Sequence, residues 1–130
     1  MSNLPDTAKL NNNGQLEIGG CSCAELTKKF GTPLYIIDEA TVRSRCKSYM
    51  NAFRKFHANC EIVYASKALC TTTICKIIAS EGLGIDVASG GEIYTAKKAG
   101  VNLKTAYFHG NNKSKEELKY ALQLLSLIHI

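Results

Sequence analysis

Three polar residues stand at matching places along the 130-residue chain, each at the carboxyl end of a short apolar segment and just before a turn. They are Lys67, Asp86 and His109. The carboxyl ends of parallel strands form one rim, where open α/β sheets and (β/α)8 barrels bind their ligands. The spacing therefore predicts that an amine, a carboxylate and an imidazole meet around one small molecule.

Lys67 carries the side chain that can form a covalent bond with an aldehyde. It ends a nearly all-apolar segment, and its neighbours Ala65, Ser66 and Ala68 are small enough to leave room for a flat ring. Partial burial favours the neutral amine, which is the form that attacks an aldehyde to make a Schiff base. The alternative is a lysine at a strand end whose head group reaches water.

Asp86 and His109 each have a structural alternative to ligand binding. A carboxylate at a strand end can bond to neighbouring backbone N–H groups, and His109 can hydrogen-bond into the turn that follows it. Glu92 lies close by in the sequence, three residues after Ser89. That spacing is explained by a capping box, so we leave Glu92 outside the predicted site.

Three βα units are predicted to position these residues. Their strands cover residues 62–67, 83–87 and 105–109, and the first two helices end at Gly82 and Gly100. The capping boxes that open the second and third helices are Ser89 with Glu92 and Ser114 with Glu117. Strands that alternate with helices indicate a parallel sheet, and hence an α/β fold.

The residues before the repeat predict two further strands and two helices. The strands are residues 16–18 and 33–37, a helix covers 22–30, and Asp38 can cap a long helix that runs to about Phe56. Apolar residues recur along one side of that long helix, so we expect this side to face the core. The stripe consists of Val42, Cys46, Tyr49, Met50, Phe53 and Phe56.

Composition excludes several classes of protein. Hydrophobic residues make up 45% of the chain and charged residues 21%, which is typical of a globular protein. The net charge of +5 is spread over several segments, and no basic run interleaves with aromatic residues as a nucleic-acid groove requires. No apolar stretch is long enough to span a bilayer, so we expect no membrane or nucleic-acid partner.

The six cysteines raise the question of disulfides or a metal site. Residues 1–13 are polar and lack the apolar core of a signal peptide, so we expect a reducing, cytoplasmic location. No cysteine pair has the C-x-x-C spacing of zinc or redox sites. We therefore expect no metal, and cysteines that serve as small buried side chains.

Three strings in order resemble one enzyme family. YASKA at 64–68 is similar to the cofactor-lysine strand of fold type III pyridoxal-phosphate decarboxylases, and GIDVASGGE at 84–92 resembles the next strand and turn. FHGNNKS at 108–114 resembles the third-strand motif of the diaminopimelate decarboxylase branch. The resemblance covers roughly residues 15–123, and together the strings are more specific than a glycine-rich pattern alone.

This resemblance implies a partial (β/α)8 TIM-like barrel of the alanine racemase and ornithine decarboxylase type. It makes Lys67 the catalytic lysine that binds pyridoxal 5'-phosphate covalently, with Ala65, Asp86 and His109 in the cofactor pocket. The implied reaction is decarboxylation of meso-2,6-diaminopimelate to L-lysine and carbon dioxide in lysine biosynthesis. The full-length enzyme is then expected to be a cytoplasmic homodimer that binds a small amino acid.

Two alternatives to this interpretation remain open. Another fold type III enzyme could act on ornithine, arginine or carboxynorspermidine, or could racemise alanine. A non-catalytic barrel fragment could bind the cofactor or a partner without turnover. The substrate rests on the resemblance alone, because a fold by itself does not determine a reaction.

The chain is expected to be an amino-terminal fragment. It holds about three βα units, whereas an eight-unit barrel needs about 250 residues. We divide it into an N-terminal segment at 1–32, a partial cofactor-binding barrel at 33–123 and an atypical tail at 124–130. The tail is apolar and unlike the family, which suggests an interrupted reading frame, and the isolated piece is expected to be inactive.

Overall fold

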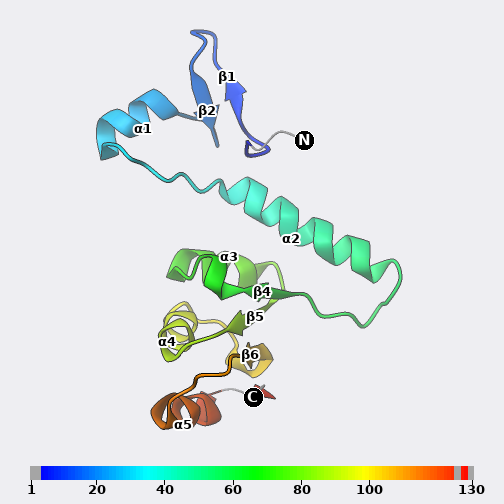
Figure 1. Ribbon diagram of the computed structural model, residues 1–130. Helices are drawn as coiled ribbons and strands as arrows, with labels where there is room; N and C mark the ends of the chain where they lie inside the picture. Colours follow the sequence, from blue (N-terminus) through cyan, green and yellow to red (C-terminus); the bar gives the residue numbers. More distant parts are fainter. Residues whose placement is uncertain (1–3, 125–126, 129–130) are drawn as a thin grey trace. The chain divides into compact units, whose positions relative to one another are not determined.

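The chain divides into two compact units, Met1–Arg45 and Cys46–Ile130. A computed structural model describes residues 4–124 and 127–128 (Figure 1). The first unit holds a small antiparallel sheet, and the second holds a parallel sheet with its helices. The division falls inside the long helix α2, which spans Glu39–Arg54.

The first unit is built around three short strands in the order β1-β2-β3. They are β1 (Lys9–Leu10), β2 (Leu16–Ile18) and β3 (Cys21–Ser22), and α1 (Cys23–Phe30) follows directly. Gly31 ends this helix at φ 82°, a left-handed angle that glycine adopts without steric cost. The predicted strand at 16–18 and the helix over 22–30 are thus confirmed.

The predicted strand at 33–37 is wrong. These residues belong to neither sheet of the described chain, and the peptide bond between Thr32 and Pro33 is cis. Tyr35 is 95% exposed, so the apolar run does not enter a core. An apolar run becomes a strand only where a neighbouring strand accepts its backbone hydrogen bonds, and Pro33 has no N–H to contribute.

Asp38 caps α2 as predicted. Its Oδ2 accepts a hydrogen bond from the Thr41 backbone N–H at 3.3 Å and from the Thr7 hydroxyl at 2.8 Å. The Thr41 hydroxyl donates to the same oxygen, and this bond is the main reason that the pKa of Asp38 lies below its ordinary value. The helix begins at the next residue, as expected from the cap.

The predicted core stripe along α2 is only partly correct. Cys46 is buried, but Tyr49 and Phe53 are more than half exposed, and Phe56 lies beyond the end of the helix and is 82% exposed. Helical periodicity shows which side of a helix is apolar, but burial also needs a partner element. The described residues supply that partner at Cys46 and leave the last turns uncovered.

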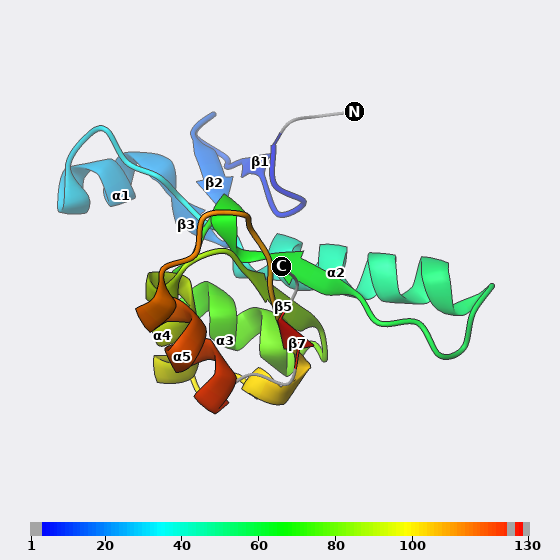
Figure 2. The same ribbon diagram turned by 60° about the horizontal axis from the view of Figure 1, so that its bottom comes forward.

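The second unit contains four parallel strands in the order β4-β5-β6-β7. Three helices join successive strands, and Figures 1 and 2 show them side by side, next to the sheet. The strands are β4 (Val63–Ala65), β5 (Gly84–Val87), β6 (Ala106–Phe108) and β7 (Leu127–Ile128). The helices are α3 (Thr72–Ser80), α4 (Gly90–Lys98) and α5 (Lys115–Leu124), with 3₁₀ turns η1 (Ser66–Ala68) and η2 (Leu103–Thr105). The predicted βα repeat is confirmed.

Residue Leu124, where the sequence suggested that an atypical tail begins, is the last residue of α5. Two tail residues, Leu127 and Ile128, form β7 and pair in parallel with Tyr107 and Phe108. The other tail residues, 125–126 and 129–130, lie outside the described part of the chain. The backbone at 127–128 therefore continues the βα pattern of the preceding units.

The core of the second unit lies between the sheet and its helices. Ile85, Val87, Ala106 and Phe108 alternate along β5 and β6 and are at most 1% exposed. Alternate residues of a strand point to opposite faces, so these four define the helix-facing side. The buried cluster is completed by Cys75, Ile93, Ala96, Ala99, Leu103 and Ala121.

The two predicted capping boxes differ. In α5 the box is complete, because Glu117 N–H donates to Ser114 Oγ at 3.1 Å and Ser114 N–H donates to Glu117 Oε2 at 3.0 Å. In α4 only half of it forms, since Ser89 Oγ accepts from Glu92 N–H but the Glu92 carboxylate binds other groups.

Phe108→Ala should destabilise the protein by about 3–5 kcal/mol, because it removes a fully buried ring and leaves a cavity. Urea unfolding of the complete gene product would measure this loss. Leu122→Ala is the control, since Leu122 is 71% exposed and should change stability by less than about 0.5 kcal/mol. Equal effects of the two changes would contradict the assigned core.

Glu117→Gln should flatten the acid limb of the stability curve. Hydrogen bonds from the Gly90 and Ser114 N–H groups hold the pKa of Glu117 below its ordinary value. The unfolded chain therefore takes up the proton first, so this stabilisation is complete above the unfolded-state pKa and is lost as the pH falls through the folded-state pKa. Urea titrations from neutral pH to about pH 3 should show a smaller loss in the variant. An unchanged slope would contradict the assigned bonds.

Candidate functional site

The parallel register aligns the predicted site residues in rows across the sheet. Ala65 pairs with Asp86, and Asp86 pairs with Tyr107. Register partners in a parallel sheet have side chains on the same face, and His109, two residues after Tyr107, returns to that face. The His109 N–H still donates to the Val87 carbonyl at 3.1 Å, so the ladder extends to it.

Asp86 and His109 bind each other at this rim. The Nδ1 of His109 and the Oδ1 of Asp86 form a hydrogen bond, and both side chains are partly buried. The described partner of Asp86 is thus an imidazole rather than the backbone N–H groups considered from the sequence. When Asp86 is ionised, Nδ1–H donates to it, which fixes the tautomer of His109 and keeps Nε2 available to a ligand.

A hollow of about 310 Å³ lies against this pair. The described residues that line it are Val63, Asp86, Tyr107 and His109. Its volume is at the lower end of the range for sites that bind small molecules. Sequence reasoning missed Val63 and Tyr107, although the two-residue alternation of a strand places them on the same face as Ala65 and His109.

Tyr107, which lines this hollow, is hydrogen-bonded to Glu61. Its hydroxyl donates to Glu61 Oε2 at 2.7 Å. The bond to an acidic acceptor favours the protonated phenol, so the pKa of Tyr107 is raised above its ordinary value. Glu61 lies just before β4, so the bond links the residues that lead into the first strand to the third strand, β6.

Lys67 lies in η1, immediately after β4, and its side chain is exposed. It is not among the described residues that line the hollow, and it makes no hydrogen bond or ion pair with the part of the chain that the structure describes. Ala65 occupies the row of Asp86. The structure therefore brings Asp86 and His109 together, with Ala65 beside them in the sheet. Lys67 lies in the turn after β4 and is exposed, as in the alternative in which its head group reaches water.

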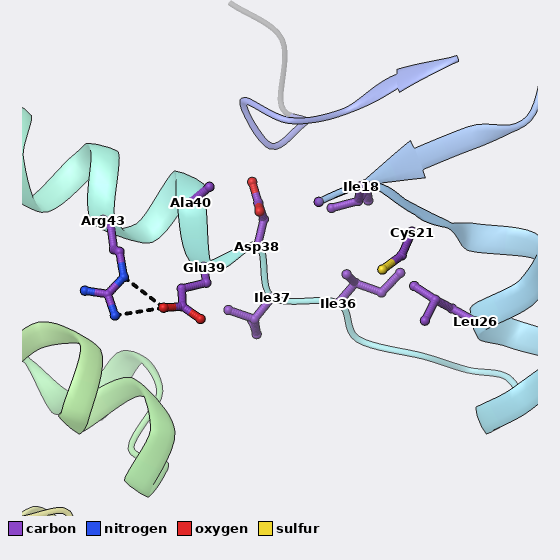
Figure 3. Close-up of a pocket in the computed structure, with 10 residues that line it drawn as sticks. Ile18, Cys21, Leu26, Ile36, Ile37, Asp38, Glu39, Ala40 and Arg43 are labelled. Carbon is purple, nitrogen blue, oxygen red and sulfur yellow. Dashed lines mark hydrogen bonds and ion pairs between the residues drawn. The ribbon is translucent and has the colours of Figure 1, made fainter. Parts of the chain in front are cut away.

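A larger hollow of about 610 Å³ lies within the first unit (Figure 3). Its walls are mainly apolar and include Ile18, Leu26 and Ile36. Its charged groups already have partners, because Asp38 caps α2 and Arg43 pairs with Glu39 at 2.7 Å. It contains none of the residues that the sequence predicts for chemistry, so the rim hollow remains the candidate site.

The cysteines only partly follow the expectation that they are buried. Cys46 and Cys75 are buried, whereas Cys21 is exposed. Burial raises the pKa of the Cys75 thiol to about 12, and its Sγ lies 4.0 Å from Cys70 Sγ. A thiol with so high a pKa is a poor nucleophile at neutral pH.

Among the described residues, no group of three or more histidine, cysteine, aspartate or glutamate side chains is arranged to hold a metal ion. No helix in the same residues has both the length and the apolar composition needed to cross a bilayer.

A parallel βα sheet with polar side chains at its carboxyl rim defines the ligand-binding part of a barrel-type α/β domain. The family model described as "Pyridoxal-dependent decarboxylase, pyridoxal binding domain" matches residues 39–125. The chain belongs to this family. The expected partial barrel fold is thereby confirmed.

The chain is also similar in sequence to curated decarboxylases. The chain is 46% identical over 117 residues to the diaminopimelate decarboxylase of Bacillus methanolicus, covering 90% of this chain and 27% of that protein. It is 46% identical over 120 residues to that of Bacillus subtilis (strain 168), covering 92% and 27%. The chain thus spans about a quarter of the length of these relatives.

Solved structures of decarboxylases have a similar fold. The diaminopimelate decarboxylase of M. jannaschii in complex with L-lysine is similar with a TM-score of 0.88 and 36% identity, over 96% of this chain and 30% of that one. A lysine/ornithine decarboxylase of Vibrio vulnificus, at 23% identity and a TM-score of 0.67, shows the fold alone.

Glu61→Gln should lower the pKa of Tyr107, because an amide is a weaker acceptor and carries no charge. Ultraviolet titration of the tyrosines measures this, and the difference between each protein and its Tyr107→Phe counterpart isolates the Tyr107 signal. In the folded protein with Glu61 present, Tyr107 should ionise above its ordinary range. A Tyr107 titration that is the same with and without Glu61 would contradict the assigned contact.

Proposed function

We propose that the complete protein decarboxylates meso-2,6-diaminopimelate to L-lysine and carbon dioxide, using pyridoxal 5'-phosphate. The observation that supports the proposal is the carboxylate–imidazole pair of Asp86 and His109 at the carboxyl rim of the sheet, where Lys67 lies in the turn that follows the neighbouring strand β4. The 46% identity to curated diaminopimelate decarboxylases selects this reaction among those of the family.

The residues at the rim fit this cofactor. The amine of Lys67 is exposed and has no described partner, so it is accessible to an aldehyde. Ala65 and the hollow beside it provide room for a flat ring, and the paired imidazole of His109 offers both a planar face and a ring nitrogen. Ligands for the phosphate group and for the pyridine nitrogen are assigned, in this proposal, to parts of the complete protein beyond these units.

Each rim residue has a distinct role in this proposal. Lys67 Nζ in its neutral form would hold the cofactor through its aldehyde carbon. Asp86 would orient His109 by accepting a hydrogen bond from Nδ1–H, and so keep the imidazole in one tautomer. When bound, pyridoxal phosphate supplies an electron sink for the pair left by the departing carboxylate. The protein's contribution is orientation and control of charge.

Other substrates of the same enzyme class are less well supported. A viral arginine decarboxylase is 18% identical and the Vibrio lysine/ornithine decarboxylase 23% identical, compared with 36% for the M. jannaschii enzyme. The string HGNN at 109–112 favours the diaminopimelate branch as well. Assays of carbon dioxide release from each amino acid separate these substrates directly.

We also propose that the complete protein is a cytoplasmic homodimer. The six cysteines are all free thiols, which is typical of a reducing compartment. The homodimer rests on the family resemblance, which implies sites that are shared between subunits. Sedimentation of the complete gene product tests the dimer.

Lys67→Ala should abolish cofactor attachment and lower carbon dioxide release from diaminopimelate by at least about a hundredfold. Borohydride reduction followed by peptide mass spectrometry shows whether a phosphopyridoxyl group lies on Lys67. Lys76→Ala is the matched control, since Lys76 is exposed on α3 and away from the rim. A phosphopyridoxyl group on another lysine instead of Lys67 in the wild-type protein would contradict the proposal. Attachment without turnover would favour a non-catalytic binding protein.

A further inference from the structure

One carboxylate oxygen connects the turn that holds Lys67 to the neighbouring βα unit. Glu92 Oε2 accepts a hydrogen bond from Ser66 Oγ at 2.5 Å and another from the Ala88 backbone N–H at 2.8 Å. Ser66 directly precedes Lys67, and Ala88 comes two residues after Asp86. The bond to Glu92 therefore links the two rim turns that carry the amine and the carboxylate of the proposed site.

Ser66 depends on this bond. Its side chain is 0% exposed, so its hydroxyl has no access to water. A buried hydroxyl that lost its acceptor would remain unsatisfied at a cost comparable to the bond itself. Ser66 also begins η1, a single 3₁₀ turn, and the hydrogen-bond geometry within such turns is poorer than in an α-helix.

We propose that Glu92 is a positioning residue for Lys67: through Ser66 it holds the η1 turn at one place on the rim, so that the amine is presented next to Asp86 and His109. Its role toward the cofactor rests on the proposed function. The hydrogen bond between Glu92 and Ser66 of the η1 turn, called the brace from here on, does not depend on the proposed function. A capping position alone does not explain Glu92, because its carboxylate does not bind the Ser89 N–H that a capping box requires.

Glu117 offers a matched control within the same chain. It occupies the equivalent position of α5, three residues after a capping serine, and its Oε1 also reaches back to the preceding unit. Its partner there is the Gly90 N–H at 2.8 Å, in the first turn of α4. Loss of Glu117 therefore removes a similar bridge without touching the η1 turn.

The first experiment measures the brace in the absence of cofactor. Hydrogen–deuterium exchange of the complete gene product is compared for wild type, Glu92→Ala, Ser66→Ala and Glu117→Ala. Glu92→Ala and Ser66→Ala should raise exchange by about tenfold in peptides covering 66–69, whereas Glu117→Ala should raise it around residues 89–91 instead. Unchanged exchange at 66–69 in Glu92→Ala would overturn the proposal, whatever the function proves to be.

The second experiment measures the consequence for Lys67. The rate at which Lys67 is labelled by pyridoxal phosphate and borohydride is followed by peptide mass spectrometry. Glu92→Ala should slow labelling about tenfold, because a misplaced amine reacts more slowly. Glu92→Gln, whose amide oxygen can accept both hydrogen bonds, should stay within about threefold, and Glu117→Ala within about twofold.

The two experiments distinguish the possible failures. Equal slowing by Glu92→Ala and Glu117→Ala would mean a general loss of stability and would overturn the positioning role. Wild-type labelling rates in Glu92→Ala would overturn it too, and leave the proposed function intact. If exchange responds as expected but wild-type Lys67 is never labelled, the brace stands and the proposed function fails. Ser66→Ala keeps the test decisive if Glu92→Ala does not fold.

Discussion

The parallel register of β4, β5 and β6 is the constraint on which the candidate site depends. It pairs Ala65 with Asp86 and Asp86 with Tyr107, and so places a carboxylate on the middle of these three strands, on the face opposite the helices. A slip by one residue would turn Asp86 toward the helices and bring Val87 or Ile85 to the rim. Burying an unpaired carboxylate among apolar side chains is costly. The buried alternation along β5 and β6 therefore holds both the core and the site in place.

Polar side chains form hydrogen bonds between the βα units at the ends of the strands. Beyond the last strand residues, the carboxylates of Glu92 and Glu117 connect successive βα units. Tyr107 and Glu61 make a similar connection across the sheet. These bonds connect the turns of the rim to one another. Preorganisation of a site reduces the cost of placing reacting groups correctly.

Local patterns predicted the second unit well and the first unit less well. Strand alternation, glycine stops and serine–glutamate spacing are set by neighbouring residues, and the βα units, the Asp38 cap and the Ser114 box all appear as expected. The predictions for residues 33–37 and for the α2 stripe were wrong or only partly correct, because strand pairing and burial depend on residues far away in the sequence. A strand needs a second strand, and an apolar helix face needs a surface to cover it. Neither requirement is visible in a window of ten residues.

By itself the sequence determined which chemical groups stand at strand ends, because an apolar run followed by Lys67, Asp86 or His109 is a local property of the chain. It also determined the family, through strings whose order matches the βα units. The tertiary structure alone decided that His109 binds Asp86, that Tyr107 lines the hollow and that Glu92 reaches Ser66. These contacts join residues 23 and 26 positions apart, or form a wall from separate strands. Their geometry follows from the register between strands, which no single segment encodes.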